Sequence, residues 1–204
     1  MKRIAVLASG RGSNFQAVID RVNDGYIPGT FTALITDNPD AYAIQRAEQA
    51  GIPVKVVDFN SFEERDQYND ALLTAMKKAD ADLYILTGYM RLLDKKTVRT
   101  FSGKMINIHP ALLPSFTGLH AQKQALDYGV KISGCTVHFV DEGMDTGQII
   151  IQRPVRVTDS DDEFSLAERI LVQEHIAMPD AVKLFCEDRI VIEDRIAGIL
   201  PPGN

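Results

Sequence analysis

Short apolar runs alternate with amphipathic stretches along the first half of the chain. Runs rich in aliphatic and β-branched residues predict strands at residues 3–8, 30–36, 53–57, 82–87 and 104–108. Helical patterns fill the gaps, at residues 13–24, 41–50, 61–79 and 94–100. Strands that alternate with helices in this way are typical of right-handed βαβ units, so the pattern predicts a parallel sheet.

The pattern changes after residue 120. A helix is expected at residues 121–128, followed by strands at 133–140 and 148–157 with no helix between them. Two strands without a crossover helix favour antiparallel pairing, so this end of the sheet should be antiparallel or mixed. A long helical stretch follows at residues 160–188, and Pro179 should kink it.

Three of the expected helices begin with the sequence signature of a capping box. The pairs that fit it are Ser13 with Gln16, Ser61 with Glu64, and Ser160 with Glu163.

Composition narrows the class of protein. The 204 residues are 45% hydrophobic and 25% charged, as in globular proteins, and 22 basic against 28 acidic residues give a net charge of −6. No basic run stands out, which argues against a nucleic-acid binder. The longest apolar run, residues 4–8, is too short to span a membrane or serve as a secretory signal. Only Cys135 and Cys186 are present, so we expect no disulfide framework and a cytoplasmic protein.

A glycine-rich loop, Ser9-Gly10-Arg11-Gly12-Ser13-Asn14, joins the first strand to the first helix. Glycines let the backbone approach an anion, and N–H groups at a helix N-terminus attract it. A dinucleotide site is an alternative, because Asp37 follows the second strand as a ribose-binding acid would. Phe15 occupies the position of the third fingerprint glycine, however, so we favour a monophosphate. A merely structural turn is the remaining alternative.

A second group of polar residues ends the fifth strand. Asn107 and His109 are two positions apart and therefore point to the same face of the sheet. A carboxamide can donate to an oxyanion, and an imidazole can move protons near neutral pH. The loop Asp-Glu-Gly-Met-Asp-Thr-Gly at residues 141–147 could supply an acid that orients the histidine. The alternative is that Asn107 caps a turn and His109 is a surface histidine.

The four histidines and two cysteines show no metal-binding spacing, so no catalytic metal is expected.

Four segments together make the sequence recognisable. In chain order they are SGRGSN, LTGYMRLL, NIHPALLPSFTG and DEGMDTG, and this set closely resembles the folate-dependent glycinamide ribonucleotide formyltransferases of purine synthesis. The resemblance spans essentially the whole chain, although Thr117 stands where many relatives have proline. It implies an α/β fold with a Rossmann-like, open, twisted, mostly parallel sheet, an antiparallel C-terminal part and helices on both faces. It also implies a cis peptide bond between Leu113 and Pro114.

The resemblance assigns roles to individual residues. It implies that Gly12, Ser13 and Asn14 bind the substrate phosphate, that Glu174 contacts the acceptor, and that Asn107, His109 and Asp145 are catalytic. The folate-binding residues implied in the same way are Arg65, Met90, Arg91, Leu92, Leu93, Asn107, Asp141, Glu142, Gly143 and Met144. A single formyltransferase domain over residues 1–204 is expected, with a phosphate-binding half at 1–100 and a folate-binding and catalytic half at 101–204.

The implied reaction moves a formyl group from 10-formyltetrahydrofolate, as cosubstrate, to the amine of glycinamide ribonucleotide. Small-molecule substrates, no nucleic acid, no membrane, no metal, and a monomer or homodimer are expected. One alternative is another formyltetrahydrofolate enzyme. A deformylase would resemble this family with an added N-terminal domain, and a methionyl-tRNA formyltransferase would need a C-terminal domain and a basic surface. The other alternative is a non-catalytic nucleotide- or folate-binding module.

Overall fold

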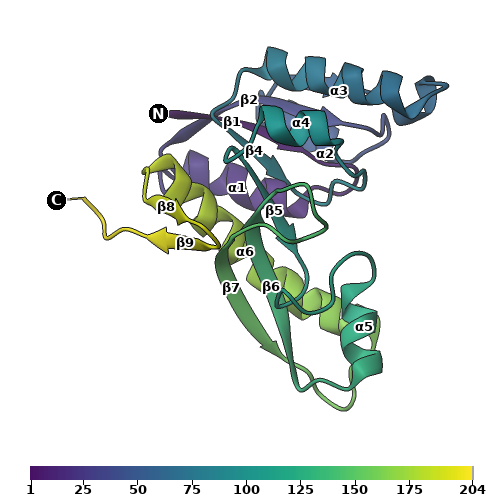
Figure 1. Cartoon of the computed structure of the whole chain (residues 1–204), viewed down its shortest axis with the longest axis vertical. Coiled ribbons are helices and arrows are strands. Elements are labelled where there is room, and N and C mark those ends of the chain that lie inside the picture. The colour runs from purple at the N-terminus through teal and green to yellow at the C-terminus, as the bar shows by residue number, and fades with distance from the viewer. Residues whose placement is uncertain (204) are drawn as a thin grey trace. The chain divides into compact units, whose positions relative to one another are not determined.

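The computed structural model describes residues 1–203 and contains an α/β fold (Figure 1). Its larger sheet has seven strands in the hydrogen-bonded order β3-β2-β1-β4-β5-β6-β7, and a separate two-stranded sheet pairs β8 with β9. The chain divides into two compact units, residues 1–106 and 107–204. The boundary falls inside β5 (Met105–His109).

The first unit is a set of parallel βαβ connections. Its elements are β1 (Lys2–Leu7), α1 (Ser13–Asn23), β2 (Gly29–Thr36), α2 (Ala43–Gln49), β3 (Val54–Val56), a 3-10 turn η1 (Phe59–Ser61), α3 (Arg65–Ala79), β4 (Leu83–Leu86) and α4 (Lys95–Thr100). Strand β1 pairs in parallel with both β2 and β4, and β2 pairs in parallel with β3. Residues 4–8 are fully buried, because β1 lies in the middle of this group of strands.

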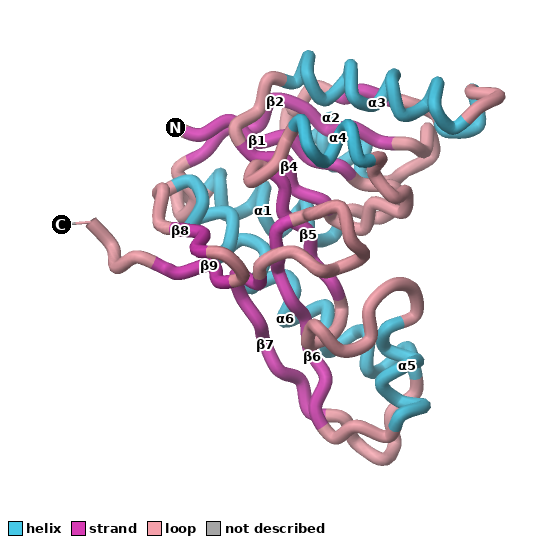
Figure 2. Tube along the Cα trace, in the orientation of Figure 1, coloured by secondary structure: helices cyan, strands magenta, loops and turns pink. Residues whose placement is uncertain are grey.

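The second unit contains the antiparallel part. Its elements after β5 are α5 (Ala121–Tyr128), β6 (Ile132–Phe139), β7 (Ile149–Arg156), α6 (Glu163–Cys186), β8 (Ile190–Glu193) and β9 (Ile196–Ile199). Strands β6 and β7 run side by side and antiparallel, as the absence of a helix between them predicted (Figure 2). Helix α6 packs on both strands, burying among others Leu166, Ile170 and Ala177.

Every strand and helix expected from the pattern is present, but the three expected capping boxes do not form. Helix α1 has Gly12 at its N-cap position, in the left-handed region, with no side-chain cap. Helix α3 begins at Arg65, four residues later than expected, because Asp58 instead caps the 3-10 turn that contains Ser61. Helix α6 begins with a capping box made by Asp162 and Ser165. At α3 and α6 the expected pair lost to competing local hydrogen bonds, since several polar residues near each start can accept one.

Two further features concern the backbone. The Leu113–Pro114 bond is cis, as the resemblance implied. The β8–β9 hairpin was not expected, because its strands are only four residues each and lie in a segment with mixed polarity. Arg195 in its turn contacts the loop at residues 141–147.

Candidate functional site

In the first unit, the glycine loop ends at the N-terminus of α1. Gly12 has a φ of +65° and lies against α2, so that a Cβ atom there would come within 2.8 Å of the Ala43 Cβ atom. Ser13 begins the helix, and Asn14 lies on its buried side. The first N–H groups of a helix have no carbonyl one turn earlier to bind, and they carry the positive end of its dipole. The loop can therefore bind an anion such as a phosphate monoester.

The segment after β4 forms a second surface loop of the same unit. Met90 and Leu92 are each about 60% exposed, at 62% and 59%, which is unusual for large apolar side chains. The backbone is nevertheless fixed: the Met90 N–H donates to Ser9 Oγ at 2.9 Å, and Arg65 Nη2 donates to the Leu92 carbonyl at 3.2 Å. Exposed apolar side chains on a fixed backbone suit a flat apolar ligand, and Arg65 serves here by holding the segment.

Asp37 has a different role from that of a ribose-binding acid. Its side chain is 2% exposed, and its Oδ2 atom accepts a hydrogen bond of 2.8 Å from Arg91 Nε. The Arg91 guanidinium also lies over the Phe59 ring, 4.0 Å from the ring centroid. Asp37 is thus engaged in an ion pair with Arg91. It does not support the dinucleotide interpretation, which required Asp37 to bind a ribose.

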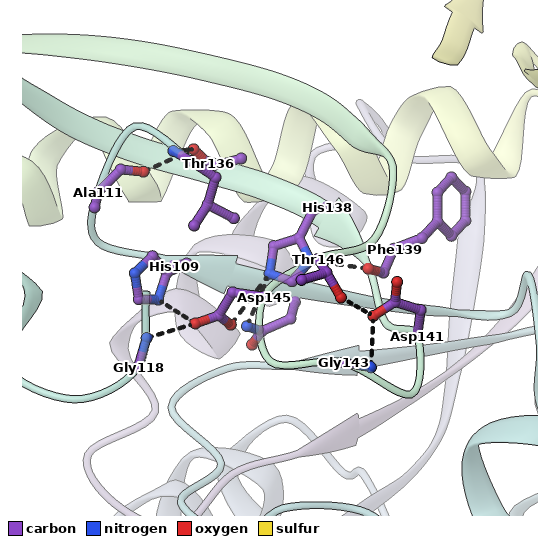
Figure 3. A network of polar contacts seen from close by, with 12 residues as sticks. His109, Ala111, Gly118, Thr136, His138, Phe139, Asp141, Gly143, Asp145 and Thr146 are labelled. Atoms are coloured by element: carbon purple, nitrogen blue, oxygen red, sulfur yellow. Dashed lines mark hydrogen bonds and ion pairs between the residues drawn. The ribbon is translucent and has the colours of Figure 1, made fainter. Parts of the chain in front are cut away.

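In the second unit, His109, Asp145 and His138 come together (Figure 3). Asn107 joins them through a hydrogen bond to His138. Asp145 lies between the two imidazoles: its Oδ2 atom is 3.4 Å from His109 Nδ1, and its Oδ1 atom is 3.7 Å from His138 Nε2. The Gly118 N–H donates to Asp145 Oδ2 at 2.8 Å and fixes the carboxylate. The sequence thus identified three members of this cluster as candidates, and the structure adds His138 from β6.

The two nitrogens of His109 both face acceptors. His109 Nε2 donates to the Phe116 carbonyl at 2.7 Å, while Nδ1 faces the Asp145 carboxylate. The side chain is 6% exposed, so these two contacts are poorly screened by water. Acceptors on both sides of the ring therefore hold the His109 imidazole in one orientation.

His138 is held by a different pair of partners. Its Nδ1–H donates to the Phe139 carbonyl at 2.8 Å, and its Nε2 atom accepts from Asn107 Nδ2 at 3.2 Å. Burial lowers the pKa of His138 below its ordinary value, so the ring is neutral and makes no ion pair with Asp145. Its role here is to hold the Asn107 carboxamide, leaving the second N–H of that amide to bind a ligand.

The pKa of His138 gives a prediction for stability. Since the unfolded chain binds a proton at His138 near pH 6.5 and the folded chain resists it, the free energy of unfolding should fall as the pH drops below about 6.5. Between pH 7.5 and 5.5 the wild type should lose more stability than His138→Gln, by at most about 1.4 kcal/mol in total, because His138 titrates in the unfolded chain near pH 6.5. Urea unfolding at the two pH values measures this difference. Parallel pH dependences in the two proteins would contradict a buried neutral His138.

The loop at residues 141–147 is closed by its own side chains. Asp141 Oδ1 accepts from the Gly143 N–H at 3.1 Å and from Thr146 Oγ1 at 2.7 Å. Asp145 has a φ of +56°, which turns its carboxylate toward the histidines. Met144 is 51% exposed, while Glu142 and Gly143 are also exposed. The loop places its acid inward and its apolar side chain outward.

Three anchors of the site were missed by the sequence analysis. Thr136 Oγ1 donates to the Ala111 carbonyl at 2.7 Å and accepts from the Leu113 N–H at 3.1 Å, which ties the turn after β5 to β6. Gln152 Nε2 donates to the Leu113 carbonyl at 2.9 Å. In the β8–β9 turn, Arg195 Nη1 donates to the Thr146 carbonyl at 2.6 Å and braces the acidic loop. Nothing in the local sequence marks these residues, since each acts on a segment distant along the chain.

Glu174 lies on the buried face of α6 and is 8% exposed. Burial, followed by the charge of Glu174, raises the pKa of the Cys135 thiol to about 12. Cys135 therefore stays a neutral thiol and is not a nucleophile.

Within residues 1–203, no three His, Cys, Asp or Glu side chains are grouped so that they could hold a metal ion. In the same residues, no helix has the length and apolar character needed to cross a membrane.

Comparison with known proteins shows which family and which solved structures this chain is similar to. Residues 2–182 match the formyl transferase family. The chain is 40% identical to phosphoribosylglycinamide formyltransferase of Bacillus subtilis, over 90% of this chain and 94% of that protein. The structure of glycinamide ribonucleotide transformylase 1 from Symbiobacterium toebii superposes with a TM-score of 0.95 at 45% identity, covering 98% of this chain and 95% of that one.

Two further relatives show how far the similarity extends. The chain is 46% identical to the trifunctional purine biosynthetic protein adenosine-3 of Drosophila melanogaster over 96% of its own length, but it spans only 15% of that protein. A formyltetrahydrofolate deformylase from Pseudomonas syringae has a TM-score of 0.92 at only 25% identity, over 98% of this chain and 66% of that one. The match to the formyl transferase family covers residues 2–182, which is most of the chain. The chain therefore belongs to the formyl transferase family.

Proposed function

We propose that this chain transfers a formyl group from 10-formyltetrahydrofolate to the amine of glycinamide ribonucleotide, a step of de novo purine synthesis. The observation that carries the proposal is the cluster of Asn107, His109 and Asp145, in which an amide donor and a histidine beside a carboxylate lie together. The proteins from Bacillus subtilis and Symbiobacterium toebii, whose names state this activity, support the choice of acceptor.

In the proposed mechanism, the neutral amine of the acceptor attacks the formyl carbon and a tetrahedral intermediate forms. The carbonyl oxygen becomes an oxyanion, which accepts hydrogen bonds from the Asn107 amide and from His109. The intermediate collapses when the bond between the formyl carbon and the folate nitrogen breaks. That nitrogen takes a proton from His109, and the proton that the attacking amine loses passes through water to His109, so charge and protons balance.

For His109 to reach the substrate, its Nε2–H must exchange partners. In this structure the Phe116 carbonyl accepts that hydrogen at 2.7 Å. Phe116 has a φ of +56°, a region that non-glycine residues rarely adopt. We propose that the substrate oxygen takes the place of this carbonyl, while the Asp145 contact on the other side of the ring stays in place and keeps the imidazole oriented.

The proposed binding residues follow the resemblance. Gly12, Ser13 and Asn14 bind the phosphate of the acceptor, and Glu174 contacts the acceptor. Folate contacts are proposed for Arg65 with Met90, Arg91, Leu92 and Leu93, and for Asn107 with Asp141, Glu142, Gly143 and Met144. The exposure of Met90, Leu92 and Met144 supports this assignment, because apolar side chains left in water are available to a pterin or benzoyl ring.

Two other functions are alternatives. A deformylase would use water in place of the amine, and the 25% identity to the Pseudomonas syringae deformylase makes this the weaker choice. A non-catalytic binding module would not require the paired amide, histidine and carboxylate.

The decisive experiment follows the absorbance change as 10-formyl-5,8-dideazafolate loses its formyl group, with and without glycinamide ribonucleotide. We expect turnover only when the acceptor is present. Turnover in buffer alone would indicate a deformylase. No turnover in either case, together with measurable binding of the folate analogue, would indicate a binding module.

We also propose that residues 1–204 act as one formyltransferase domain with a phosphate-binding and a folate-binding half. Small-molecule substrates, a cytoplasmic location, no resident metal, and a monomer or homodimer belong to the same proposal.

A further inference from the structure

Two consecutive carbonyls of the glycine loop are bound by helix α2. The Ala43 N–H donates to the Gly10 carbonyl at 3.1 Å, and Arg46 Nε donates to the Arg11 carbonyl at 2.8 Å. These are the carbonyls of the peptide units that lead into Gly12. Helix α2 therefore holds both acceptors of this turn on its own side.

The direction of these carbonyls determines the direction of the neighbouring N–H groups. A peptide unit is planar, and in the trans form its C=O and N–H point in opposite directions. The only cis bond in residues 1–203 is Leu113–Pro114, so the Arg11–Gly12 peptide is trans. Drawing the Arg11 carbonyl toward Arg46 consequently turns the Gly12 N–H away from α2. A carbonyl facing an anion would repel it, whereas the N–H attracts it.

Arg46 is itself held in place from two further sides. Its Nη1 atom donates to Gln16 Oε1 in the first turns of α1 at 3.0 Å, and its guanidinium lies 4.9 Å from the centroid of the Tyr42 ring. One guanidinium thus connects α2, the loop carbonyl and α1. The planar fork of arginine allows these two hydrogen bonds at fixed angles, which a lysine cannot reproduce.

We propose that Arg46 is a positioning residue for phosphate binding: by fixing the Arg11 carbonyl, it aims the loop N–H groups at the phosphate of the acceptor. This inference rests on the proposed function for the identity of the acceptor. It requires no contact between Arg46 and the ligand. It differs from a stability role, because it predicts a change in the affinity for the phosphate-bearing substrate alone.

The test compares Arg46→Met with the wild type in steady-state kinetics. We expect KM for glycinamide ribonucleotide to rise at least about 10-fold, with kcat and KM for the folate analogue changed less than about 3-fold. Arg21→Met is the matched control, since Arg21 on the same helix as Gln16 also pairs with a side chain, Asp24, and lies over a tyrosine ring, Tyr26. We expect it to leave KM for the acceptor unchanged.

Arg46→Lys separates geometry from charge. Lysine keeps the positive charge but lacks the planar guanidinium. We therefore expect Arg46→Lys to avoid less than half of the increase in log KM for glycinamide ribonucleotide that Arg46→Met causes. Full recovery by lysine would mean that charge alone acts and would overturn the proposal. An unchanged KM in Arg46→Met, or an equal loss of kcat and of both KM values, would also overturn it.

Direct binding keeps this inference distinct from the proposed function. Titration of each protein with ribose 5-phosphate, followed by ³¹P NMR, should show weaker binding in Arg46→Met than in the wild type. A wild type that binds this phosphate without formylating glycinamide ribonucleotide would refute the proposed function but not the role of Arg46. A wild type that binds no phosphate would overturn the role of Arg46 as well.

Discussion

Replacing His109 with alanine should lower kcat at least about 100-fold, which corresponds to about 2.7 kcal/mol of transition-state stabilisation. The expected loss is large because His109 supplies a hydrogen bond to the developing oxyanion and the proton for the leaving nitrogen. Asp145→Asn should cause a loss of similar size. Asparagine can still accept from the Gly118 N–H and tolerates the positive φ, so the charge facing His109 Nδ1 is removed while the Gly118 contact is kept.

The double variant tests whether the two residues act together. If the carboxylate works through the imidazole, His109→Ala combined with Asp145→Asn should be little slower than His109→Ala alone. His120→Asn is the control: it removes an exposed histidine at a position that also has positive φ, and it should leave kcat unchanged. Fully additive losses would show that Asp145 acts independently. Near-normal turnover in His109→Ala would exclude the histidine from the mechanism and favour the binding-module alternative.

The arrangement of strands and helices could be predicted because it depends on local periodicity. Residues 4–8 form an unbroken apolar run, which is typical of a strand buried on both faces, and they are fully buried. The antiparallel pairing of β6 with β7 followed from the lack of room for a crossover helix. Both inferences need only the order of apolar and polar residues along the chain.

The capping residues of α3 and α6 could not be predicted, because several neighbouring residues compete for the same N–H groups. At the start of α6, Asp162 and Ser165 form the capping box, although Ser160 and Glu163 fit the signature equally well. Asp161 accepts from the Thr158 N–H and pairs with Arg169, which draws the preceding turn into a different shape. Which of these near-equal local bonds forms cannot be read from the spacing of the residues alone.

The site was predictable only in part for a similar reason. Asn107 and His109 lie on one strand, so their spacing alone places them on one face. The neutral state of His138 depends on its burial, which is not visible in the order of residues. The bracing of the acidic loop by Arg195 joins positions 49 residues apart. Such contacts follow from the fold, which the local pattern does not specify to this level.

Gly147→Ala should damage both stability and catalysis, because this glycine lies against the backbone of β6. A Cβ atom at Gly147 would come within 1.7 Å of the Phe139 carbonyl oxygen, so the strand or the loop must move. That carbonyl accepts the Nδ1–H of His138, which in turn holds Asn107. We expect the free energy of unfolding to fall by about 2 kcal/mol or more, and kcat to fall about 10-fold or more as the Asn107 amide loses its orientation.

Gly143→Ala provides the contrast, because there the obstructing atom belongs to a side chain. A Cβ atom at Gly143 would lie 2.0 Å from Thr146 Oγ1, so the additional change Thr146→Ala removes this shortest contact and leaves only the residue 146 Cβ atom, at 3.2 Å. This second change also removes the bond from Thr146 to Asp141, so recovery of stability should be partial. No side-chain change can relieve Gly147→Ala in the same way, because a main-chain oxygen is in the way. Urea unfolding and steady-state kinetics of the three variants measure the difference. Normal kcat in Gly147→Ala, with the protein folded, would show that the path from Phe139 through His138 to Asn107 does not orient the catalytic amide.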